Sequence, residues 1–345
     1  MNFKKWRKSA SLVIVAKNAI SSPSQFNYNL LTMKRSSKTS IHPEVTVFPG
    51  GILEKNADTS KEWLNIFDKF GFPFESFVND NPTSVKPPIF LSENSNEIPR
   101  CLSLRITAIR ETFEESGILI CRDENAHHED KLHWSNHIIL DDVNKWQKRI
   151  HNDPMEFLNL CSHFKVYPDV LSLHDWSNWF TPSSVKAKFD TVFFLSAFNK
   201  IPPTMAEKGE VMHLQWSSPL DYEEERRTRK IKLLVPQFYE ISRLRNFSDV
   251  NGLLLFAQDR AQSGLEKFFP FVVSSEKETC MLLPGDDLYP QNYNPDNDEV
   301  VELKEITGTQ VRHRVCSLPK RIGRIEVQNY KPRFNHVLPI TSTTL

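Results

Sequence analysis

The stretch "AIRETFEESGI", Ala108–Ile118, places three glutamates within five positions. Because each residue turns a helix by about 100°, Glu114 and Glu115 fall within about 60° of Glu111. The pattern therefore predicts a helix that buries one face and concentrates negative charge on the other. The apolar residues that form the opposite face are Leu102, Ile106, Ile109 and Phe113.

Repulsion within this acidic stripe does not by itself require a cation. Like charges at these helical spacings cost only about 0.2–0.5 kcal/mol per pair, so a solvated acidic face is the alternative interpretation. We expect the helix to begin at Pro99 and to end at Gly117, because glycine readily takes the left-handed conformation that closes a helix.

The rest of the chain alternates between strand and helix patterns. A proline-rich stretch at 71–100 predicts a loop insertion, and the polar stretch at 291–345 carries no pattern from which an element is predicted. Runs of β-formers predict strands at 11–17, 28–36, 44–51, 189–198 and 211–218, and a hairpin at 271–287. The 44–51 strand is expected to end at Pro49, Gly50 and Gly51. Helices are expected at 219–230, 235–244 and 248–260, and as a pair within 141–164 that breaks at Asp153–Pro154.

The charges of the 345-residue chain are balanced, with 43 basic and 43 acidic residues. Such a chain has no overall field that attracts nucleic acid or an anionic membrane, so both are unlikely as partners. No apolar run approaches the roughly 20 residues that span a bilayer. The first apolar run, "SLVIVAK", is interpreted as a strand and not as part of a targeting peptide. The cysteines are odd in number and lack metal-type spacing, which predicts reduced thiols at Cys101, Cys121, Cys161, Cys280 and Cys316.

Two motifs carry a resemblance to the Nudix hydrolase superfamily. "RETFEESGI", Arg110–Ile118, resembles the second half of the Nudix signature, and "FPGG", Phe48–Gly51, resembles the entry to its first half. At the position where the signature has an acidic residue, this chain has Ala57. The nearby acidic residues are Asp58, one position later, and Glu54, three positions earlier. The gap before Arg110 runs from 59 to 109 and is 44 residues longer than the signature's gap.

An insertion at this point of the signature is typical of one branch, the acyl-coenzyme A diphosphatases called nucleoside diphosphate-linked moiety X motif 19. The segments "DWSNWFTP", "FDTVFFL" and "LLPGDDLY" also look like that branch. The resemblance implies an α/β fold, a Nudix-type α/β/α sandwich around a mixed sheet. It places a Nudix domain at 8–245, with insertions at about 59–100 (a loop) and 125–185 (helical). An extension at 246–290 would pack on that domain, and a polar tail would follow at 291–345.

The resemblance also implies a metal-dependent hydrolysis of phosphoric anhydrides. It assigns Mg²⁺ or Mn²⁺ to Glu111 and Glu115, with Glu114 as a ligand of a second metal or as the base. Arg110 is expected to orient a neighbouring carboxylate. The base that activates water is expected to be Glu210, with Glu207 as the alternative, although either could be an ordinary exposed glutamate.

Coenzyme A or acyl-coenzyme A is the substrate that the branch implies, giving adenosine 3′,5′-bisphosphate and (acyl-)4′-phosphopantetheine. "LLTMKRS" resembles the coenzyme A motif of related diphosphatases, so Lys34 and Arg35 are expected to bind substrate. Gly50 and Gly51 would let the loop backbone approach the helix, and their alternative interpretation is an ordinary turn. Alternative functions are a Nudix diphosphatase for ADP-ribose, a dinucleotide or an RNA cap, and a non-catalytic Nudix-like binding protein.

Other conspicuous residues are interpreted as structural. Trp176, Trp179 and Phe180 are expected to pack in a core and not to line a pocket. His127 and His128 are interpreted as loop residues, because no second pair of ligands has metal-type spacing. The basic residues after position 319 are interpreted as a solvated tail. Relatives in the branch are peroxisomal, but Thr343-Thr344-Leu345 lacks the basic residue of that address, so the cytosol and the mitochondrion are alternatives.

Overall fold

The main sheet of the computed structural model is mixed and runs in the order β10-β7-β8-β1-β2-β3, with β4 added to β1 and β9 to β2. β1 and β8 are parallel, whereas β1 pairs with β2 antiparallel. The structure describes residues 6–18, 25–39, 42–72, 87–91, 94–124, 132–293, 300–306, 309–318 and 321–341. The strands of the main sheet are β1 Arg7–Lys17, β2 Tyr28–Arg35, β3 Thr46–Val47, β4 Gly50–Ile52, β7 His174–Phe180, β8 Phe189–Phe198, β9 Val211–Ser217 and β10 Lys267–Phe268.

The central strand β1 is buried on both faces, which explains its unbroken apolar run. Side chains alternate along a strand, so Leu12 and Ile14 join one core while Val13 and Val15 join the other. The expected strands at 11–17, 28–36, 189–198 and 211–218 are confirmed by β1, β2, β8 and β9.

The segment 44–51 differs from the single strand that was predicted. β3 covers only Thr46–Val47, and the chain bends at Phe48–Pro49 because proline has no N–H to continue a ladder. Gly50 and Gly51 do not end a strand but begin β4, which pairs with Ala10 and Ser11 of β1. The bend therefore leads the chain from β3, which pairs with β2, to β4, which places the two glycines next to β1.

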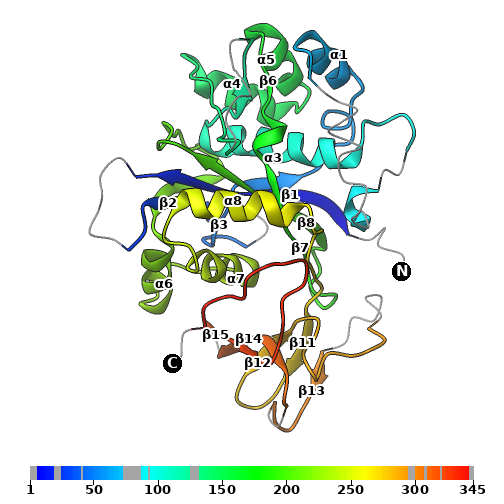
Figure 1. The fold of residues 1–345 in the computed structure, drawn as a ribbon, viewed down its shortest axis with the longest axis vertical. Coiled ribbons are helices and arrows are strands. Elements are labelled where there is room, and N and C mark those ends of the chain that lie inside the picture. The colour runs from blue at the N-terminus through cyan, green and yellow to red at the C-terminus, as the bar shows by residue number, and fades with distance from the viewer. Residues whose placement is uncertain are drawn as a thin grey trace.

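The acidic helix α3, Arg100–Ser116, lies across one face of the main sheet and packs on β1 and β4 (Figure 1). Its predicted ends are confirmed: Pro99 precedes the first turn, and Gly117 closes the helix with φ 73°. Helices from the two insertions cover α3 from above in the view of Figure 1. These elements are α1 Glu62–Lys69, η2 Pro88–Phe90, α4 Val143–Asn152 and α5 Glu156–Phe164.

The expected pair of helices within 141–164 is confirmed by α4 and α5, which separate at Asp153–Pro154. The 125–185 segment is less helical than expected, because it also contains β7, a strand of the main sheet. Short elements connect these parts, namely β5 Cys121–Arg122 paired with β6 Tyr167–Pro168, and η3 Val170–Ser172. His127 and His128 lie outside the described residues.

Three helices cover the opposite face of the main sheet and form the second core with it. They are α6 Pro219–Arg227, α7 Val235–Leu244 and α8 Val250–Ala261, and they confirm the helices predicted there. Trp176 and Trp179 of β7 lie within this core, as expected. Both indole N–H groups donate to the fully buried carboxylate of Glu240 on α7, at 2.8 and 2.7 Å. α7 is therefore fixed to the sheet by polar as well as apolar contacts.

A second sheet of five strands occupies the C-terminal part of the chain, in the order β13-β11-β12-β14-β15 (Figure 1). Two of its strands, β11 and β12, confirm the predicted hairpin at 271–287. Its other strands lie in the polar stretch for which no element was predicted. The strands are β11 Phe271–Ser274, β12 Thr279–Leu282, β13 Val301–Glu302, β14 Arg312–Leu318 and β15 Arg321–Gln328.

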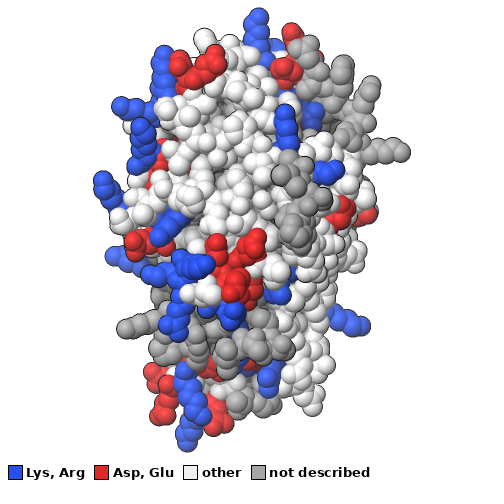
Figure 2. Space-filling model, turned by 90° about the vertical axis from the view of Figure 1, so that its left-hand side faces the viewer, with Lys and Arg blue, Asp and Glu red and all other residues white. Residues whose placement is uncertain are grey.

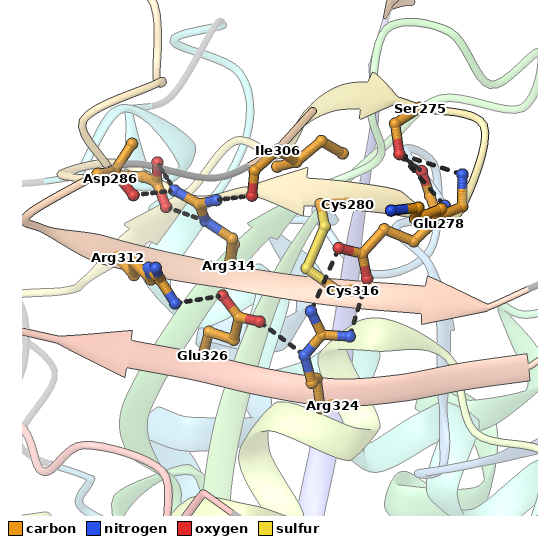
Figure 3. The surroundings of a disulfide bond; sticks show 12 residues. Ser275, Glu278, Cys280, Asp286, Ile306, Arg312, Arg314, Cys316, Arg324 and Glu326 are labelled. Carbon is orange, nitrogen blue, oxygen red and sulfur yellow. Dashed lines mark hydrogen bonds and ion pairs between the residues drawn. A yellow bond between two sulfur atoms is a disulfide. The ribbon is translucent and has the colours of Figure 1, made fainter. Parts of the chain in front are cut away.

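The second sheet corrects the prediction that all five cysteines are reduced thiols. Cys280 of β12 and Cys316 of β14 are direct partners in the ladder and form a disulfide (Figure 3). Spacing along the sequence could not reveal the pair, because 36 residues separate the two cysteines and only the strand register aligns them. Arg324 of β15 was predicted to lie in a solvated tail. It instead forms ion pairs with Glu278 and Glu326 beside the disulfide.

The last described residues return to the main domain. The backbone N–H of Ile340 donates to the carbonyl of Ser242 on α7, and the side chain of Asn246 donates to the carbonyl of Leu338. Phe334 lies against Gly264, where a Cβ atom would come within 2.7 Å of its ring. The polar stretch therefore packs on the core of the main domain.

The surface agrees with the balanced composition. Figure 2 shows Asp and Glu side chains next to Lys and Arg side chains on one side of the molecule, with a broad area of uncharged residues between the charged groups. Within the described ranges, no helix combines the length and the apolar character that crossing a membrane requires.

The disulfide can be tested by replacing both Cys280 and Cys316 with Ser. Closing a loop of 36 residues restricts the unfolded chain, so we expect the double variant to lose about 3–4 kcal/mol of unfolding free energy under non-reducing conditions. Urea denaturation with and without reductant measures the loss, which should vanish when the natural protein is reduced. Equal alkylation of Cys280, Cys316 and the thiols Cys121 and Cys161 in unfolded, unreduced protein would show that the bond is absent.

Candidate active site

The two glycines of β4 bring the acidic helix against the main sheet. The backbone N–H of Gly50 donates to Oε2 of Glu115 at 2.9 Å. Gly50 has φ +150°, and a Cβ atom there would lie 2.3 Å from the carbonyl oxygen of Ala10. A Cβ atom on Gly51 would lie 2.3 Å from Cδ of Glu111. Gly50 therefore requires glycine, because a Cβ atom would clash with backbone, whereas a side chain at position 51 would displace the carboxylate of Glu111.

Arg110 connects the acidic helix to the loop that follows β4. Its guanidinium is buried and donates to Asp58 through Nε and Nη2, at 2.8 and 2.9 Å. Nη2 also donates to the carbonyl of Ile52 at 3.1 Å. Nη1 donates to Oε1 of Glu114 at 2.6 Å and to Oε1 of Glu111 at 3.0 Å. One cation therefore orients two of the three glutamates.

Asp58 supplies the acid that the signature places one residue earlier. Ala57 is buried, and Asp58 is fully buried with both carboxylate oxygens engaged. Besides Arg110, this carboxylate accepts from the backbone N–H of Glu54 and from the hydroxyl of Thr107, each at 2.9 Å. The departure at position 57 is therefore compensated locally by the next residue.

The three glutamates share a region that is poor in water. Burial raises the pKa of Glu111 to about 7, raises that of Glu114, and raises that of Glu115 well above its usual range. Repulsion between Glu111 and Glu115 adds to the increase for Glu115. The acidic face is thus not the solvated surface of the alternative interpretation, because negative charge there is costly without a nearby cation.

The donor set fits a hard divalent cation. Oxygen atoms of carboxylates are the ligands that Mg²⁺ and Mn²⁺ prefer, and Glu111 and Glu115 present theirs beside the Gly50–Gly51 bend. Glu114 is turned toward Arg110 instead. Over the described ranges, the one group of three ligand atoms within 4.8 Å of one another belongs to Glu278, Cys280 and Cys316, whose sulfur atoms are bonded to each other. Within the described residues, the helix therefore presents two carboxylates beside the bend, and no third His, Cys, Asp or Glu ligand atom joins them at that spacing.

The loop before β9 lies along the end of α3 and carries both candidate bases. The backbone N–H of Met205 donates to the carbonyl of Ser116, and that of Glu207 donates to the carbonyl of Glu115. The carboxylate of Glu207 accepts from the backbone N–H groups of Gly209 and Glu210, so it stabilises its own turn. Glu210 is exposed, and its charge acts on Glu114 and Glu115.

Two residues of α4 also reach the site, although no motif in the sequence pointed to them. Gln147 is buried, and its Nε2 donates to the carbonyls of Phe113, Glu114 and Met205, at 3.3, 3.0 and 2.9 Å. Nδ1 of His151 lies 3.9 Å from Oε2 of Glu114. Both residues belong to an insertion without a motif, so only the packing of α4 on α3 reveals them.

The structure separates the two basic residues that were expected to bind substrate. Arg35 is near enough to Glu115 for its charge to oppose the increase in pKa that burial causes. Lys34 alternates to the opposite face of β2, the face on which Thr32 donates to the hydroxyl of Tyr222 on α6. Arg35 therefore lies with the glutamates, whereas Lys34 does not.

Comparisons with known proteins match this chain to one family by sequence and to one fold by structure. A model of the NUDT19 Nudix domain matches residues 6–244. The acyl-coenzyme A diphosphatases NUDT19 of Xenopus laevis and Homo sapiens are each 32% identical to this chain, over 98% of it and 96% of those proteins. The crystal structure of a NUDIX hydrolase from Alicyclobacillus acidocaldarius superimposes with a TM-score of 0.52 at 18% identity, covering 76% of this chain and 97% of that one. The likeness to that structure shows the fold.

Replacement of Asp58 by Asn tests the ion pair beneath the site. The variant leaves Arg110 buried with part of its charge uncompensated, so we expect the unfolding free energy to fall by about 3–5 kcal/mol. Urea denaturation in the presence of a chelator measures the loss without contributions from metal. Glu54→Gln is the control, because Glu54 is exposed four residues earlier and should change the free energy by less than about 0.5 kcal/mol. A loss for Asp58→Asn no larger than that of the control would contradict the assignment.

Proposed function

Because this chain belongs to the NUDT19 Nudix domain family, we propose that it is a metal-dependent diphosphatase that hydrolyses coenzyme A and acyl-coenzyme A. The products would be adenosine 3′,5′-bisphosphate and (acyl-)4′-phosphopantetheine. The observation that carries the proposal is the contact of Glu111 and Glu115 with the Gly50–Gly51 bend, in a place where burial raises the pKa of both carboxyls.

Glu111 and Glu115 would hold a Mg²⁺ or Mn²⁺ ion, and Glu114 would hold a second ion or orient the first through the contact with Arg110. When bound, such an ion screens the negative charge of a diphosphate and lowers the pKa of a coordinated water. The protein's own part is to hold these carboxylates in place, which Arg110 and Gly50 support through hydrogen bonds.

Glu210 is the proposed general base. Its carboxylate would take a proton from the attacking water, whose oxygen forms the new bond to phosphorus while the bridging P–O bond of the anhydride breaks. Glu210 suits this role better than Glu207, because the carboxylate of Glu207 is occupied by two backbone N–H groups. Exposure of Glu210 at the edge of the site leaves its oxygen atoms accessible to water.

Arg35 is the proposed contact for a substrate phosphate. Its Nε is buried and has no hydrogen-bond partner among the described residues, and its charge reaches Glu115. Gly50 and Gly51 would shape the floor on which the diphosphate lies, since any side chain there would clash with β1 or with Glu111. The family resemblance also leads us to propose a peroxisomal location, which fractionation of cells expressing the full chain tests.

Replacement of Glu115 by Gln tests the metal assignment. We expect kcat to fall by about a hundredfold or more, because the amide binds a divalent cation poorly, while folding is preserved. Release of adenosine 3′,5′-bisphosphate from coenzyme A and acyl-coenzyme A, with Mg²⁺ or Mn²⁺, measures the rate. Glu207→Gln is the matched control and should keep most of the activity. Turnover of ADP-ribose faster than of coenzyme A by the natural protein would refute the substrate, and unchanged turnover by Glu115→Gln would refute the metal site.

Gln147→Leu tests the contact between α4, α3 and the loop that carries Glu210. The variant removes the Gln147 donor from three carbonyls, of which that of Phe113 still accepts from the N–H of Gly117, so we expect about 1–3 kcal/mol less unfolding free energy. Because the loop is then held less firmly, kcat should fall by about tenfold with a smaller change in KM. Gln262→Leu, at an exposed position after α8, is the control. Loss of stability with unchanged kcat would limit Gln147 to a structural role.

A further inference from the structure

A cavity of about 220 Å³ lies on the face of the main sheet that α6 covers. Strands β2, β3 and β9 form its floor, and α6 with the turn that follows forms its wall. The lining residues are Thr32, Lys34, Thr46, His213, Gln215, Glu225, Lys230 and Ile231.

The cavity is separate from the glutamates of α3. On β2, Leu31 packs in the core beneath α3, whereas Thr32 faces α6 and donates to the hydroxyl of Tyr222 at 3.0 Å. Lys34 lies two residues after Thr32 and therefore on the same face. The sheet itself stands between this cavity and the site that contains Glu111 and Glu115.

Positive charge in the lining of the cavity exceeds negative charge, with two lysines and one glutamate. Neither the Lys34 nor the Lys230 ammonium has a hydrogen-bond or ion-pair partner among the described residues. The carboxylate in the lining, Glu225, accepts two hydrogen bonds from Nε2 of Gln215, at 2.9 and 3.0 Å. Two ammonium groups thus share the cavity with one carboxylate, which leaves one positive charge in excess, and the imidazole of His213 lies beside them.

The wall of the cavity is held in place by backbone hydrogen bonds. The N–H of Lys230 donates to the carbonyl of Glu225, and the N–H of Thr46 donates to the carbonyl of Lys232. Arg229, the residue before Lys230, takes a left-handed conformation with φ 64° that turns the chain back toward β3. The cavity is therefore preformed, and an anion entering it would not need to order the loop.

We propose that this cavity binds a free phosphate-class oxyanion, independently of the hydrolytic site. Lysine ammonium groups bind such anions as point charges, and hydroxyl and imidazole groups can add hydrogen bonds. The volume is below the roughly 300–1,000 Å³ of pockets that hold drug-sized ligands, so it suits an ion such as phosphate and not a nucleotide. The proposal rests on the cavity alone and does not depend on the substrate proposed above.

Titration of the full chain with inorganic phosphate tests the site. Isothermal calorimetry is carried out with a chelator present and at constant ionic strength, for the natural protein and for Lys34→Gln combined with Lys230→Gln. We expect the double variant to bind phosphate about tenfold or more weakly, because two ammonium groups are lost. The control combines Lys61→Gln with Lys277→Gln, which removes the same charge from exposed positions outside the cavity and its wall and should bind as the natural protein does.

A second pair of variants separates this site from the glutamates. Glu111→Gln combined with Glu115→Gln should still bind phosphate with natural affinity, and saturating coenzyme A added to that variant should not displace the phosphate. Equal phosphate affinity in the two lysine double variants would overturn the proposal. Displacement of phosphate by coenzyme A would also overturn it, since the cavity would then serve a phosphate group of the substrate.

Discussion

The contact between the Gly50–Gly51 bend and helix α3 depends on one buried cation, Arg110. Its guanidinium joins Asp58, the carbonyl of Ile52 and two glutamates, so a single side chain fixes the loop after β4, the bend and the acidic stripe relative to one another. Without that cation, three carboxylates would share a water-poor space in which each already has a raised pKa. The positive charge of Arg110 thus makes it possible to keep negative charge on the neighbouring glutamates, which is the condition for attracting a divalent cation.

A second buried carboxylate plays a comparable part on the other face of the sheet. Glu240 accepts from two tryptophan indoles and from the hydroxyl of Ser177, and Arg243 beside it also pairs with Glu266. Tyr330, from the chain beyond the second sheet, donates to the same Glu266. The chain after the C-terminal sheet is therefore linked to the core of the main domain through a largely buried polar network. Buried polar groups are costly without partners, so these contacts favour one arrangement of the two sheets.

Sequence patterns predicted elements well where a local rule decides the structure. Pro99 and Gly117 limit α3 by their own backbone preferences, and the β-formers of β8 need only a sheet to join. The patterns failed where distant parts meet. Cys280 and Cys316 pair because a strand register aligns them, and Gln147 reaches α3 because α4 packs there. Lys34 and Arg35 are adjacent in the sequence, yet side chains alternate along a strand, so the two lie on opposite faces of the sheet. Their basic character alone could not show which of the two faces the glutamates.

The long insertion within the signature is tolerated because its two ends meet. The backbone N–H of Ile98 donates to the carbonyl of Thr59, so the chain leaves the site after Asp58 and returns beside it just before α3 begins. Glu97 and Arg100, both in the returning segment, form an ion pair close to this hydrogen bond. The entropy of closing a loop grows only with the logarithm of its length, so most of the added residues cost little once the ends are joined. The insertion also contributes to the core, since Trp63, Phe67 and Ile89 pack with the apolar face of α3. Asp58 therefore reaches Arg110 at hydrogen-bond distance despite the insertion, so the site depends on the distance between these side chains in space and not on their separation in the sequence.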